Sequence, residues 1–360
     1  MTPKVAVVYL SYGVRPFLDE VLSCWEQVDY PRDRWELIIV DNPIGDGSAD
    51  LIREKVLPKS ESFLPKVTLI VNETNTGFAE GNNTGIRLAL EHGVDYVYLE
   101  NNDAKFHSDV LREAVKMAES DDRIGSVQSL MLLWKKPEVI NSTGGMVHFL
   151  GFGFVRDNGK CLGDVSIRDG EEIAYASGAA VLYRASVLRK VGLLDPFLFL
   201  YHEDLELGWR IRLAGYRNVL SVSSIVYHQY EFRRSIQKFF WMERNRILVH
   251  ASHLRLSTLV LLFPLWLGVE CALLVFAIKG GWWKEKKKVY GSFLQRSIWR
   301  YVVEKRYASH VLRQGVSDRK MLSLFTAKIE HQDMRNVFVE QIGNPLMTGI
   351  WRIFFFLIRW

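Results

Sequence analysis

The residues best suited to chemistry lie in the segment HEDLELGWRIRLAGY, which runs from His202 to Tyr216. This segment places two carboxylates, Glu203 and Asp204, at the start of a predicted helix. A carboxylate held in a fixed direction on a helix can accept a proton from a bound substrate. The alternative is structural, because Asp204 can cap the helix and Glu203 can interact with its dipole.

The spacing within this segment predicts an amphipathic helix. Apolar and basic residues recur three to four positions apart. We expect Leu205, Trp209 and Leu213 to share one buried stripe, and Arg210 and Arg212 to point elsewhere.

The first half of the chain alternates short β-branched runs with longer amphipathic stretches, which is typical of βαβ units around a mostly parallel sheet. The predicted strands are Lys4–Leu10, Glu36–Asp41, Val67–Val71, Val94–Glu100 and Ile124–Gln128. The predicted helices are Val14–Gln27, Ser48–Val56, Phe78–His92 and Ser108–Glu119. Residues 131–169 are rich in glycine and aromatic residues and are interpreted as a substrate-facing insertion, followed by strands at 173–184 and 217–228.

Polar residues follow each predicted strand, where sheets of this type bind ligands. Ser11 and Tyr12 follow the first strand, and Asp41 ends the second. An exposed Asp41 carboxylate can accept hydrogen bonds from a base or a ribose. An ordinary turn is the alternative, since Asp and Asn beside glycine often form one.

The segment NTGFAEGNNTG, residues 75–85, combines glycines and amides at the start of a predicted helix. Its backbone N–H groups can meet a phosphate or a sugar. It matches neither the Walker loop nor GxGxxG, so a glycine-rich helix entry explains it equally well.

Two further segments contain candidate metal ligands. LENNDAKF ends the fourth strand with Asn101, Asn102 and Asp103, and one carboxylate suffices for Mg²⁺ or Mn²⁺ when a diphosphate and waters supply the other ligands. His228 ends the strand SIVYH and can offer an imidazole to the same metal or to a phosphate. A strand-end turn and a structural histidine are the alternatives.

Composition narrows the class of protein. The 360 residues carry a net charge of +5, with basic residues crowded beside apolar stretches in the second half, which favours an anionic membrane surface over nucleic acid. The three cysteines have no CxxC spacing and indicate neither a disulfide framework nor a cysteine metal site. The N-terminus shows no secretion signal, so we expect a cytoplasmic, reducing environment.

The second half contains a basic amphipathic stretch at 232–253 and an apolar segment, Leu256–Ile278, long enough to cross a bilayer. Basic residues flank this segment on both sides, including Lys286, and a single crossing would send one cluster outward. Pro264 is expected to break it into two arms that enter and leave from one face. The tail Leu346–Trp360 resembles an interfacial helix, which favours monotopic attachment over a true crossing or a buried core helix.

Taken together, these motifs resemble the inverting glycosyltransferases of family 2, which have the GT-A fold. The resemblance covers Val5 to Asn245 through VAVVYLSYG, IIVDNPIGDGS, NTGFAEGNNTGI, LENNDA, ASGAAVLYRASVLRKVGLLDP, HEDLELGWRIRLAGY and VYH. Asn101 stands in place of the first Asp of a strict DxD element, so metal binding is expected to be weak or dependent on the donor. The QxxRW signature of processive synthases is absent, which implies transfer of one sugar per encounter.

The resemblance implies a role for each matching residue. Asp204 is the general base with Glu203 beside it, and Asp103 and His228 serve the metal, Mn²⁺ or Mg²⁺. Acceptor binding falls to Ser177, Gly178 and Ala179. The donor-binding residues are Ser11, Tyr12, Asp41, Asn75, Gly77, Phe78, Asn82, Asn101 and Asn102.

The resemblance also implies an overall organisation and activity. It implies that residues 1–230 form a GT-A domain with a donor half, 1–128, and an acceptor half, 129–230. The apolar and basic stretches of the second half, rather than the resemblance, predict that residues 231–360 form a helical membrane-associated region on the cytoplasmic face and suggest a lipid-borne acceptor. The expected reaction moves one hexose to a lipid-linked saccharide, with mannose from GDP-mannose first and rhamnose from dTDP-rhamnose next. A sugar-phosphate nucleotidyltransferase and a catalytically silent membrane-bound scaffold are the competing interpretations.

Overall fold

The computed structural model describes residues 2–229, 239–330 and 339–360, which form two compact units. The sheet unit comprises Met1–Gly145, Val155–Ile211 and Tyr216–Tyr230. The helical unit comprises Met146–Phe154, Arg212–Gly215 and Glu231–Trp360. Two short segments of the first 230 residues thus belong to the helical unit.

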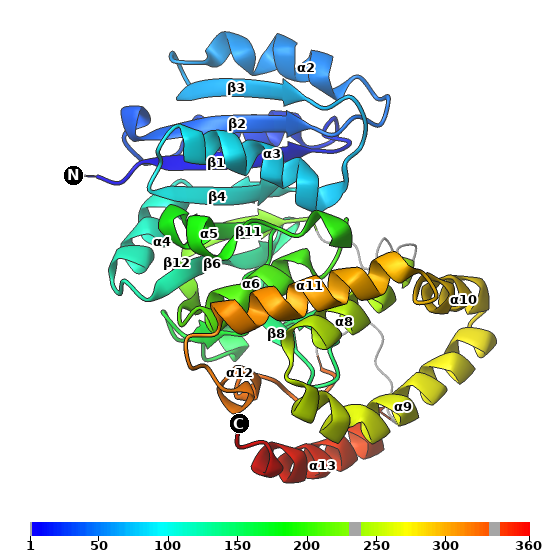
Figure 1. Ribbon diagram of the computed structural model, residues 1–360. Coiled ribbons are helices and arrows are strands. Elements are labelled where there is room, and N and C mark those ends of the chain that lie inside the picture. Colours follow the sequence, from blue (N-terminus) through cyan, green and yellow to red (C-terminus); the bar gives the residue numbers. More distant parts are fainter. Residues whose placement is uncertain (1, 230–238, 331–338) are drawn as a thin grey trace. The chain divides into compact units, whose positions relative to one another are not determined.

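A ten-stranded sheet organises the sheet unit, with its main path in the order β10-β12-β6-β11-β4-β1-β2-β3 (Figure 1). The short strands β5 and β7 pair with β12 and β6. Strand bounds are Val5–Ser11 (β1), Trp35–Asp41 (β2), Lys66–Val71 (β3), Tyr96–Asn101 (β4), Ala104–Phe106 (β5), Ile124–Leu133 (β6), Lys136–Ser142 (β7), Glu172–Ile173 (β10), Ala180–Arg184 (β11) and Arg217–His228 (β12). A separate two-stranded sheet pairs β8 (Gly145–Val147) with β9 (Gly153–Val155).

Most long strands of this sheet run in one direction. β1 is parallel to β2 and β4, and β2 is parallel to β3. β11 is antiparallel to both β4 and β6, while β12 is parallel to β6. The β-branched runs of β1 and β2 are buried on both faces, as parallel strands covered by helices require, whereas the edge strand β3 is only partly buried. The predicted α/β fold with a mostly parallel central sheet is confirmed.

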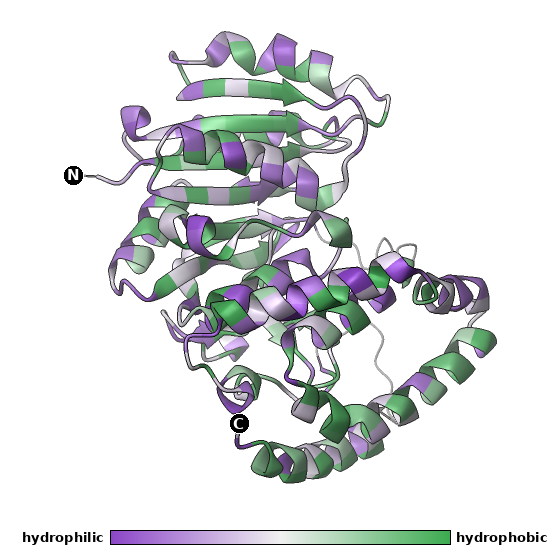
Figure 2. Ribbon diagram, in the orientation of Figure 1, coloured by the Kyte–Doolittle hydropathy of each residue, from purple (hydrophilic) through white to green (hydrophobic). Residues whose placement is uncertain are grey.

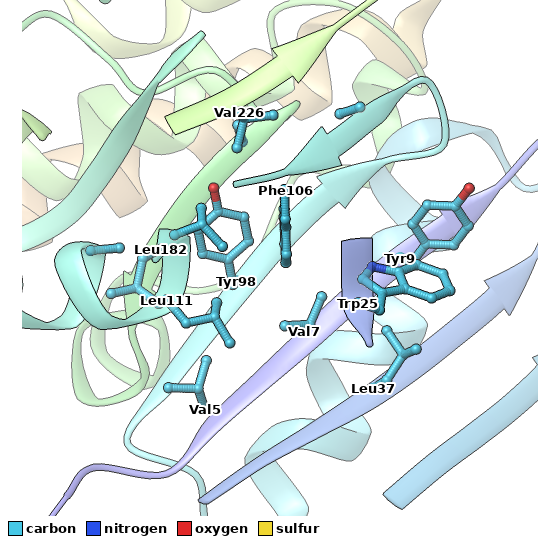
Figure 3. Close-up of a cluster of buried hydrophobic side chains, with 14 of the residues drawn as sticks. Val5, Val7, Tyr9, Trp25, Leu37, Tyr98, Phe106, Leu111, Leu182 and Val226 are labelled. Atoms are coloured by element: carbon cyan, nitrogen blue, oxygen red, sulfur yellow. The ribbon is translucent and has the colours of Figure 1, made fainter. Parts of the chain in front are cut away.

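The core of the sheet unit gathers aromatic and aliphatic side chains on one face of the sheet, as Figure 3 shows. Tyr9 and Trp25 meet edge to face with ring centroids 4.8 Å apart, and Tyr98 and Phe106 do so at 5.1 Å. Such pairs add about 0.5–1.5 kcal/mol beyond the burial of their area. This packing fixes the strands whose ends carry the polar motifs.

Helices connect and cover the strands, close to the predicted ranges. They are Leu18–Trp25 (α1), Ser48–Lys55 (α2), Gly77–Glu91 (α3), Val110–Glu119 (α4), Ala185–Val191 (α5) and Glu203–Leu213 (α6). Three of the predictions about strands and the insertion needed correction. β6 extends to Leu133 and residues 136–155 form short strands rather than one loose insertion, and the strand predicted at 173–184 is interrupted between β10 and β11.

The helix α6 is buried on all sides and is not amphipathic. Leu205, Trp209 and Leu213 are buried as expected, but so are both arginines. Arg210 makes a two-pronged ion pair with Glu206, which is itself buried. The expectation that the arginines point away from the core was wrong, because paired guanidinium groups can be buried when their hydrogen bonds are satisfied.

The helical unit contains the remaining helices of the described chain. They are Phe239–His253 (α8), Leu256–Lys279 (α9), Trp283–Ser292 (α10), Arg296–Leu312 (α11), Asp318–Leu322 (α12) and Asn344–Leu357 (α13). Residues 232–238 of the predicted basic helix lie outside the described residues. α9 runs unbroken through Pro264, so the predicted break into two arms was wrong. Figure 2 shows α9 and α13 as predominantly hydrophobic helices.

Candidate active site

The polar motifs converge on one edge of the sheet. Parallel registry pairs Ser11 with Asp41 and Leu10 with Asn101, so β1, β2 and β4 end together. Because β11 runs the other way, its beginning lies at this same edge. β12 runs with β6 and brings His228 to the corresponding end. Strand direction alone therefore brings together residues that lie far apart in the sequence.

Asp204 is tied to this edge through the loop that precedes β11. Its Oδ2 accepts a hydrogen bond from Gly178 N at 3.1 Å, and its Oδ1 accepts one from Leu205 N at 2.7 Å. The neighbouring Ala179 O accepts from Asn101 N at 3.1 Å. Asp204 and the loop after β4 are therefore linked through Gly178 and Ala179, two consecutive residues.

The environment of Asp204 favours its use as a base. Burial raises the pKa of its carboxyl, while the two main-chain N–H groups oppose that shift. A carboxylate with a raised pKa holds a proton better than an ordinary aspartate at neutral pH. Asp204 does bond to a main-chain N–H of its own helix, but its other oxygen is directed to Gly178. The capping interpretation accounts for only one of the two contacts.

The backbone before Asp204 is strained. Phe199, Tyr201 and His202 have φ values of 62°, 65° and 69°, in the left-handed region that favours glycine. Phe199 O accepts hydrogen bonds from Phe78 N at 2.8 Å and Ala79 N at 3.3 Å, which ties this loop to the start of α3. Strain of this kind persists where surrounding contacts enforce it, and it concentrates at functional sites.

Glycines allow the close approach of these loops. A Cβ on Gly178 would lie 3.0 Å from the Phe78 ring and 3.7 Å from Asp204 Cβ. A Cβ on Gly77 would lie 2.5 Å from the Phe199 ring, and Gly77 has φ +82°. Phe78, Gly178 and Asp204 therefore meet at one point, as predicted residues of the donor, acceptor and base groups should.

Asp103 and His228 are brought together by the pairing of β5 with β12, which sets His228 opposite Ala104. His228 Nε2 lies 3.2 Å from Asp103 Oδ1. The other ring nitrogen, Nδ1, lies 2.9 Å from Asn141 Oδ1 on β7. Asn141 was not among the predicted residues, because a single amide within a strand gives no recognisable signal.

The pair fits a divalent cation that is shared with a ligand. A carboxylate oxygen and an imidazole nitrogen are suitable donor atoms for Mn²⁺, and Mg²⁺ accepts the carboxylate. Within the described residues no group of three or more His, Cys, Asp or Glu side chains could hold a metal ion by itself. The protein therefore offers two ligands here, and the remaining positions suit a diphosphate and waters.

Asp41 is buried at the end of β2, only 2% exposed, rather than exposed as expected. Its Oδ1 accepts a hydrogen bond from Ser11 Oγ at 2.7 Å. Burial raises the pKa of this carboxyl, and the Ser11 hydrogen bond opposes the shift. Ser11 and Asp41 are thus brought together, and the proposed contact to a base or ribose would involve a sequestered carboxyl.

Asn42 connects three segments beside Asp41. Its Nδ2 donates to Gly77 O at 2.8 Å, and its Oδ1 accepts from Asn72 Nδ2 at 2.7 Å and Thr76 Oγ1 at 3.1 Å. Asn75 Oδ1 accepts from Gly77 N at 2.9 Å. These bonds shape the entry to α3, where Asn82 Nδ2 donates to Phe78 O at 2.9 Å.

The remaining predicted donor residues lie at the ends of β1 and β4. Asn102 Nδ2 donates to Tyr12 O at 2.9 Å, and Asn102 O accepts from Tyr9 OH at 3.2 Å. Tyr12 is exposed and lies beside this loop. Tyr12, Asn101 and Asn102 therefore occupy the same edge as Asp103.

The predicted acceptor loop, Ser177 to Ala179, is positioned by a residue that the sequence did not suggest. Gln128 is fully buried on β6, and its Oε1 accepts from Ser177 N at 2.9 Å. Gln128 Nε2 donates to Ser142 Oγ at 3.3 Å. This hydrogen bond lies in the interruption between β10 and β11, next to Gly178, whose N–H is donated to Asp204.

Glu203 differs from its neighbour in exposure. Its side chain is buried, with 4% of the residue exposed, whereas Asp204 remains partly exposed. A base must reach the hydroxyl from which it takes a proton, so the geometry favours Asp204 over Glu203. The catalytic role predicted for Glu203 stays a prediction.

Residues 3–247 match the family described as Glycosyltransferase like family 2. The chain belongs to this glycosyltransferase family. The matched residues include every motif described above, from the first strand to His228. The chain is therefore a glycosyltransferase with a GT-A-like fold.

Two curated relatives are similar in sequence. A dolichyl N-acetyl-α-D-glucosaminyl phosphate 3-β-D-2,3-diacetamido-2,3-dideoxy-β-D-glucuronosyltransferase from Methanococcus voltae is 19% identical over 245 residues, 65% of this chain and 69% of the relative. The putative teichuronic acid biosynthesis glycosyltransferase TuaG of Bacillus subtilis is 25% identical over 114 residues, 32% of this chain and 41% of the relative.

Solved structures share the fold. The mannosyltransferase PcManGT from Pyrobaculum calidifontis, in complex with GDP-Man and Mn²⁺, has a TM-score of 0.52 at 18% identity, covering 86% of this chain and 87% of that one. GalNAc-T7 with UDP, GalNAc and Mn²⁺ has a TM-score of 0.53 at 15% identity, covering 70% and 48%. At these identities the likeness concerns the fold alone.

Proposed function

We propose that this glycosyltransferase moves one hexose from a nucleoside-diphosphate sugar to a lipid-linked saccharide, with inversion at the anomeric carbon and with a divalent cation. The observation that supports the proposal is the link between the Asp103–His228 pair and Asp204 along one sheet edge. Separate groups are thus available for the leaving diphosphate and for the attacking hydroxyl.

The base in this proposal is Asp204. An acceptor hydroxyl gives its proton to the Asp204 carboxylate as its oxygen attacks the anomeric carbon from the face opposite the diphosphate. Gly178 N and Leu205 N orient the carboxylate, so that little reorganisation is needed. General-base assistance of this kind contributes about 10²–10⁴ in rate.

Asp103 and His228 would hold the cation, Mn²⁺ or Mg²⁺. When bound, such a cation neutralises charge that develops on the departing diphosphate. Asn101, which replaces an acidic ligand in this element, leaves the protein with few charges at the site. Cation binding is therefore expected to be tighter with nucleotide present than without it.

GDP-mannose is our first choice of donor, and dTDP-rhamnose the second. The fold neighbour from Pyrobaculum calidifontis was solved with GDP-Man and Mn²⁺, which supports the class of donor. Thermal shift with GDP, UDP and dTDP, each with and without Mn²⁺, discriminates among the bases, because at equal concentration the ligand with the higher affinity stabilises the fold more. We expect GDP with Mn²⁺ to give the largest shift.

A lipid-borne acceptor is supported by the surface of the helical unit. α9 buries a narrow stripe that contains Thr258, Leu262 and Ala277, while much of its remaining surface is exposed. Leu256, Val260, Phe263 and Leu267 recur at helical spacing and are each 48–66% exposed. A large exposed apolar surface is typical of a membrane interaction site.

We propose that α9 lies in the plane of the membrane, on its cytoplasmic face. By length and composition the helix is long enough to cross. Glu270, however, is buried and ion-paired with Arg246 of α8 and with Lys286 of α10, at 2.9 Å in the second case. If α9 crossed the membrane, Glu270 would lose these partners and its charge would lie in the hydrocarbon region, which is unfavourable. Anionic headgroups can be bound by exposed basic side chains of this unit, which are Lys279, Lys284, Lys287, Lys288, Arg352 and Arg359.

Incubation with labelled nucleotide sugars and Mn²⁺ tests the activity. Without its acceptor, the proposed transferase should hydrolyse the nucleotide sugar slowly, with water in place of the acceptor hydroxyl, and release nucleoside diphosphate. Removal of the cation by a chelator should stop this release. A membrane-bound scaffold releases none, and a nucleotidyltransferase instead forms nucleotide sugar from nucleoside triphosphate and sugar phosphate. Either of the last two results would overturn the proposal.

Flotation with vesicles tests the membrane surface. Phe263→Glu should reduce binding to vesicles that contain anionic lipid several-fold, because it places a charge on the exposed face of α9. Phe63→Glu, at an apolar side chain of the sheet unit that is 66% exposed against 55% for Phe263, is the matched control and should leave binding unchanged. Equal losses in both variants, or in neither, would contradict the assigned surface.

A further inference from the structure

The buried side-chain amide of Asn141 contacts the ring of His228 on the side opposite Asp103. This residue is part of neither the sequence motifs nor the proposed function. Asn141 lies on β7 and is 2% exposed. Its Oδ1 is 2.9 Å from His228 Nδ1. Among the residues that the structure describes, no acceptor lies within hydrogen-bonding distance of Asn141 Nδ2. The imidazole ring is thus the polar partner to which this side chain is directed.

The ring lies between an amide and a carboxylate. His228 Nε2 is 3.2 Å from Asp103 Oδ1, while Nδ1 faces Asn141. A neutral imidazole has one N–H, which is on one nitrogen or the other. With Asn141 Oδ1 toward the ring, Nδ1 holds the hydrogen and donates it, so Nε2 presents its lone pair on the side of Asp103.

The opposite arrangement is also open to an amide. If the Asn141 side chain turns over, Nδ2 donates to Nδ1, and the ring hydrogen moves to Nε2, where it can be donated to Asp103. A carboxylate in place of Asn141 could accept but not donate, and would allow only the first arrangement. The residue type at position 141 therefore decides which tautomers His228 can adopt.

We propose that Asn141 is a positioning residue that sets the tautomer of His228, and so makes Nε2 available to a divalent cation beside Asp103. The proposal rests on the proposed function, in which His228 is a cation ligand. Partners of this kind on the second nitrogen of a ligating histidine fix its orientation, and their loss typically weakens metal binding by about 10–100-fold. The amide also permits the Nε2–H form when the cation is absent.

Two variants test the proposal in opposite directions. Asn141→Leu has a similar shape but removes the hydrogen-bonding group, and we expect the Kd for Mn²⁺ in the presence of GDP to rise about tenfold or more, measured by electron paramagnetic resonance. Asn141→Asp keeps the acceptor and should bind Mn²⁺ no more weakly than the wild-type protein. Thermal unfolding of each variant verifies that the full chain is folded.

The tautomer itself provides a readout that a merely structural role would not move. Nitrogen-15 NMR of labelled histidine, with the His228 signals assigned by His228→Gln, reports which ring nitrogen holds the hydrogen in cation-free protein. Asn141→Asp should shift the population toward Nδ1–H, and this result remains decisive if Asn141→Leu does not fold. Unchanged tautomers and unchanged Mn²⁺ affinity in the folded variants would overturn the inference.

Failure of this inference is distinguishable from failure of the proposed function. If the wild-type protein binds Mn²⁺ with nucleotide and Asp103→Ala abolishes that binding, the site stands whatever the Asn141 variants do. If neither Asp103 nor His228 affects Mn²⁺ binding, the cation site is elsewhere, and both this inference and the cation site of the proposed function are wrong, while the activity assay still tests hexose transfer itself.

Discussion

The candidate active-site edge of the sheet unit and the interior of the helical unit bury ionisable side chains in different ways. At the sheet edge, Asp204 is held by main-chain N–H groups, Asp41 by Ser11 and Glu100 by Trp25 Nε1 at 2.8 Å. Burial raises the pKa of all three carboxyls. Their hydrogen-bonding partners here are uncharged, so these groups keep a tendency to take up protons.

In the helical unit, opposite charges are buried together. Glu243 and Glu270 are both paired with Arg246 and with Lys286, which is fully buried although the sequence grouped it with the surface cations. Burial alone would raise the pKa of Glu243, but Arg246 and Lys286 hold it below its usual value. The comparison shows that the charge of the partner decides what a buried carboxyl does. Carboxyls with neutral partners remain able to take up a proton, whereas carboxyls paired with cations stabilise the packing of α8, α9 and α10.

The largest effect is expected at Asp204. Asp204→Asn should lower transfer by about 10²–10⁴-fold, because the amide cannot accept the proton. Donor affinity should stay within a few-fold, as measured by calorimetry with a nucleoside diphosphate and Mn²⁺. Asp109→Asn is the control, because Asp109 also lies at the start of a helix, α4, but has no proposed role in the reaction. Persistent transfer by Asp204→Asn would place the base elsewhere.

Breaking the paired charges of the helical unit should act on stability. Arg246→Met leaves two buried carboxylates with one cation fewer, and removal of one partner from a buried pair costs about 3–5 kcal/mol. Denaturant unfolding of the full chain measures this loss. A change below about 1 kcal/mol would show that the network does not fasten the helices, and would weaken the contrast with the sheet edge.

Removal of the carboxylate at Asp103 should affect binding rather than folding. Asp103→Ala is expected to weaken Mn²⁺-dependent donor binding about tenfold or more, with little effect on binding measured in a chelator. The exposed Asp50→Ala in α2 is a matched control within the same unit. Unchanged Mn²⁺ dependence in the Asp103 variant would remove its assigned role.

The most pH-dependent effect is expected at Glu100, which precedes Asn101 in β4. Its folded pKa is raised well above the unfolded value by burial, so the folded state binds its proton more tightly. Stability from this group is full below the unfolded pKa and is lost as pH rises through the folded pKa.

Glu100→Gln should remove that dependence, so the variant gains up to about 1.4 kcal/mol per pH unit relative to wild type between the unfolded and the folded pKa of Glu100. The unfolding free energy at pH 5 to 9 measures the difference. Parallel curves for the two proteins would show that Glu100 titrates alike in both states.

Much of the fold and part of the site could be predicted from local sequence. Apolar runs located β1, β2 and β3 closely, and strand direction then placed Ser11, Asp41 and Asp103 at one edge. The residues that were missed, Gln128 and Asn141, act through partners distant in sequence, and a lone amide in a strand does not reveal such partners. The buried arginines of α6 were mispredicted for the same reason, since Glu206 neutralises Arg210 only once both are packed. Pro264 was expected to end a helix that in fact continues.

The central claim is a direct displacement with Asp204 as base at the sheet edge. The measurement that tests it most directly is the anomeric configuration of the first sugar released when the preferred nucleotide sugar is hydrolysed with Mn²⁺, followed by NMR before the anomers equilibrate. The account predicts the configuration opposite to that of the donor. A product that retains the donor configuration would contradict it.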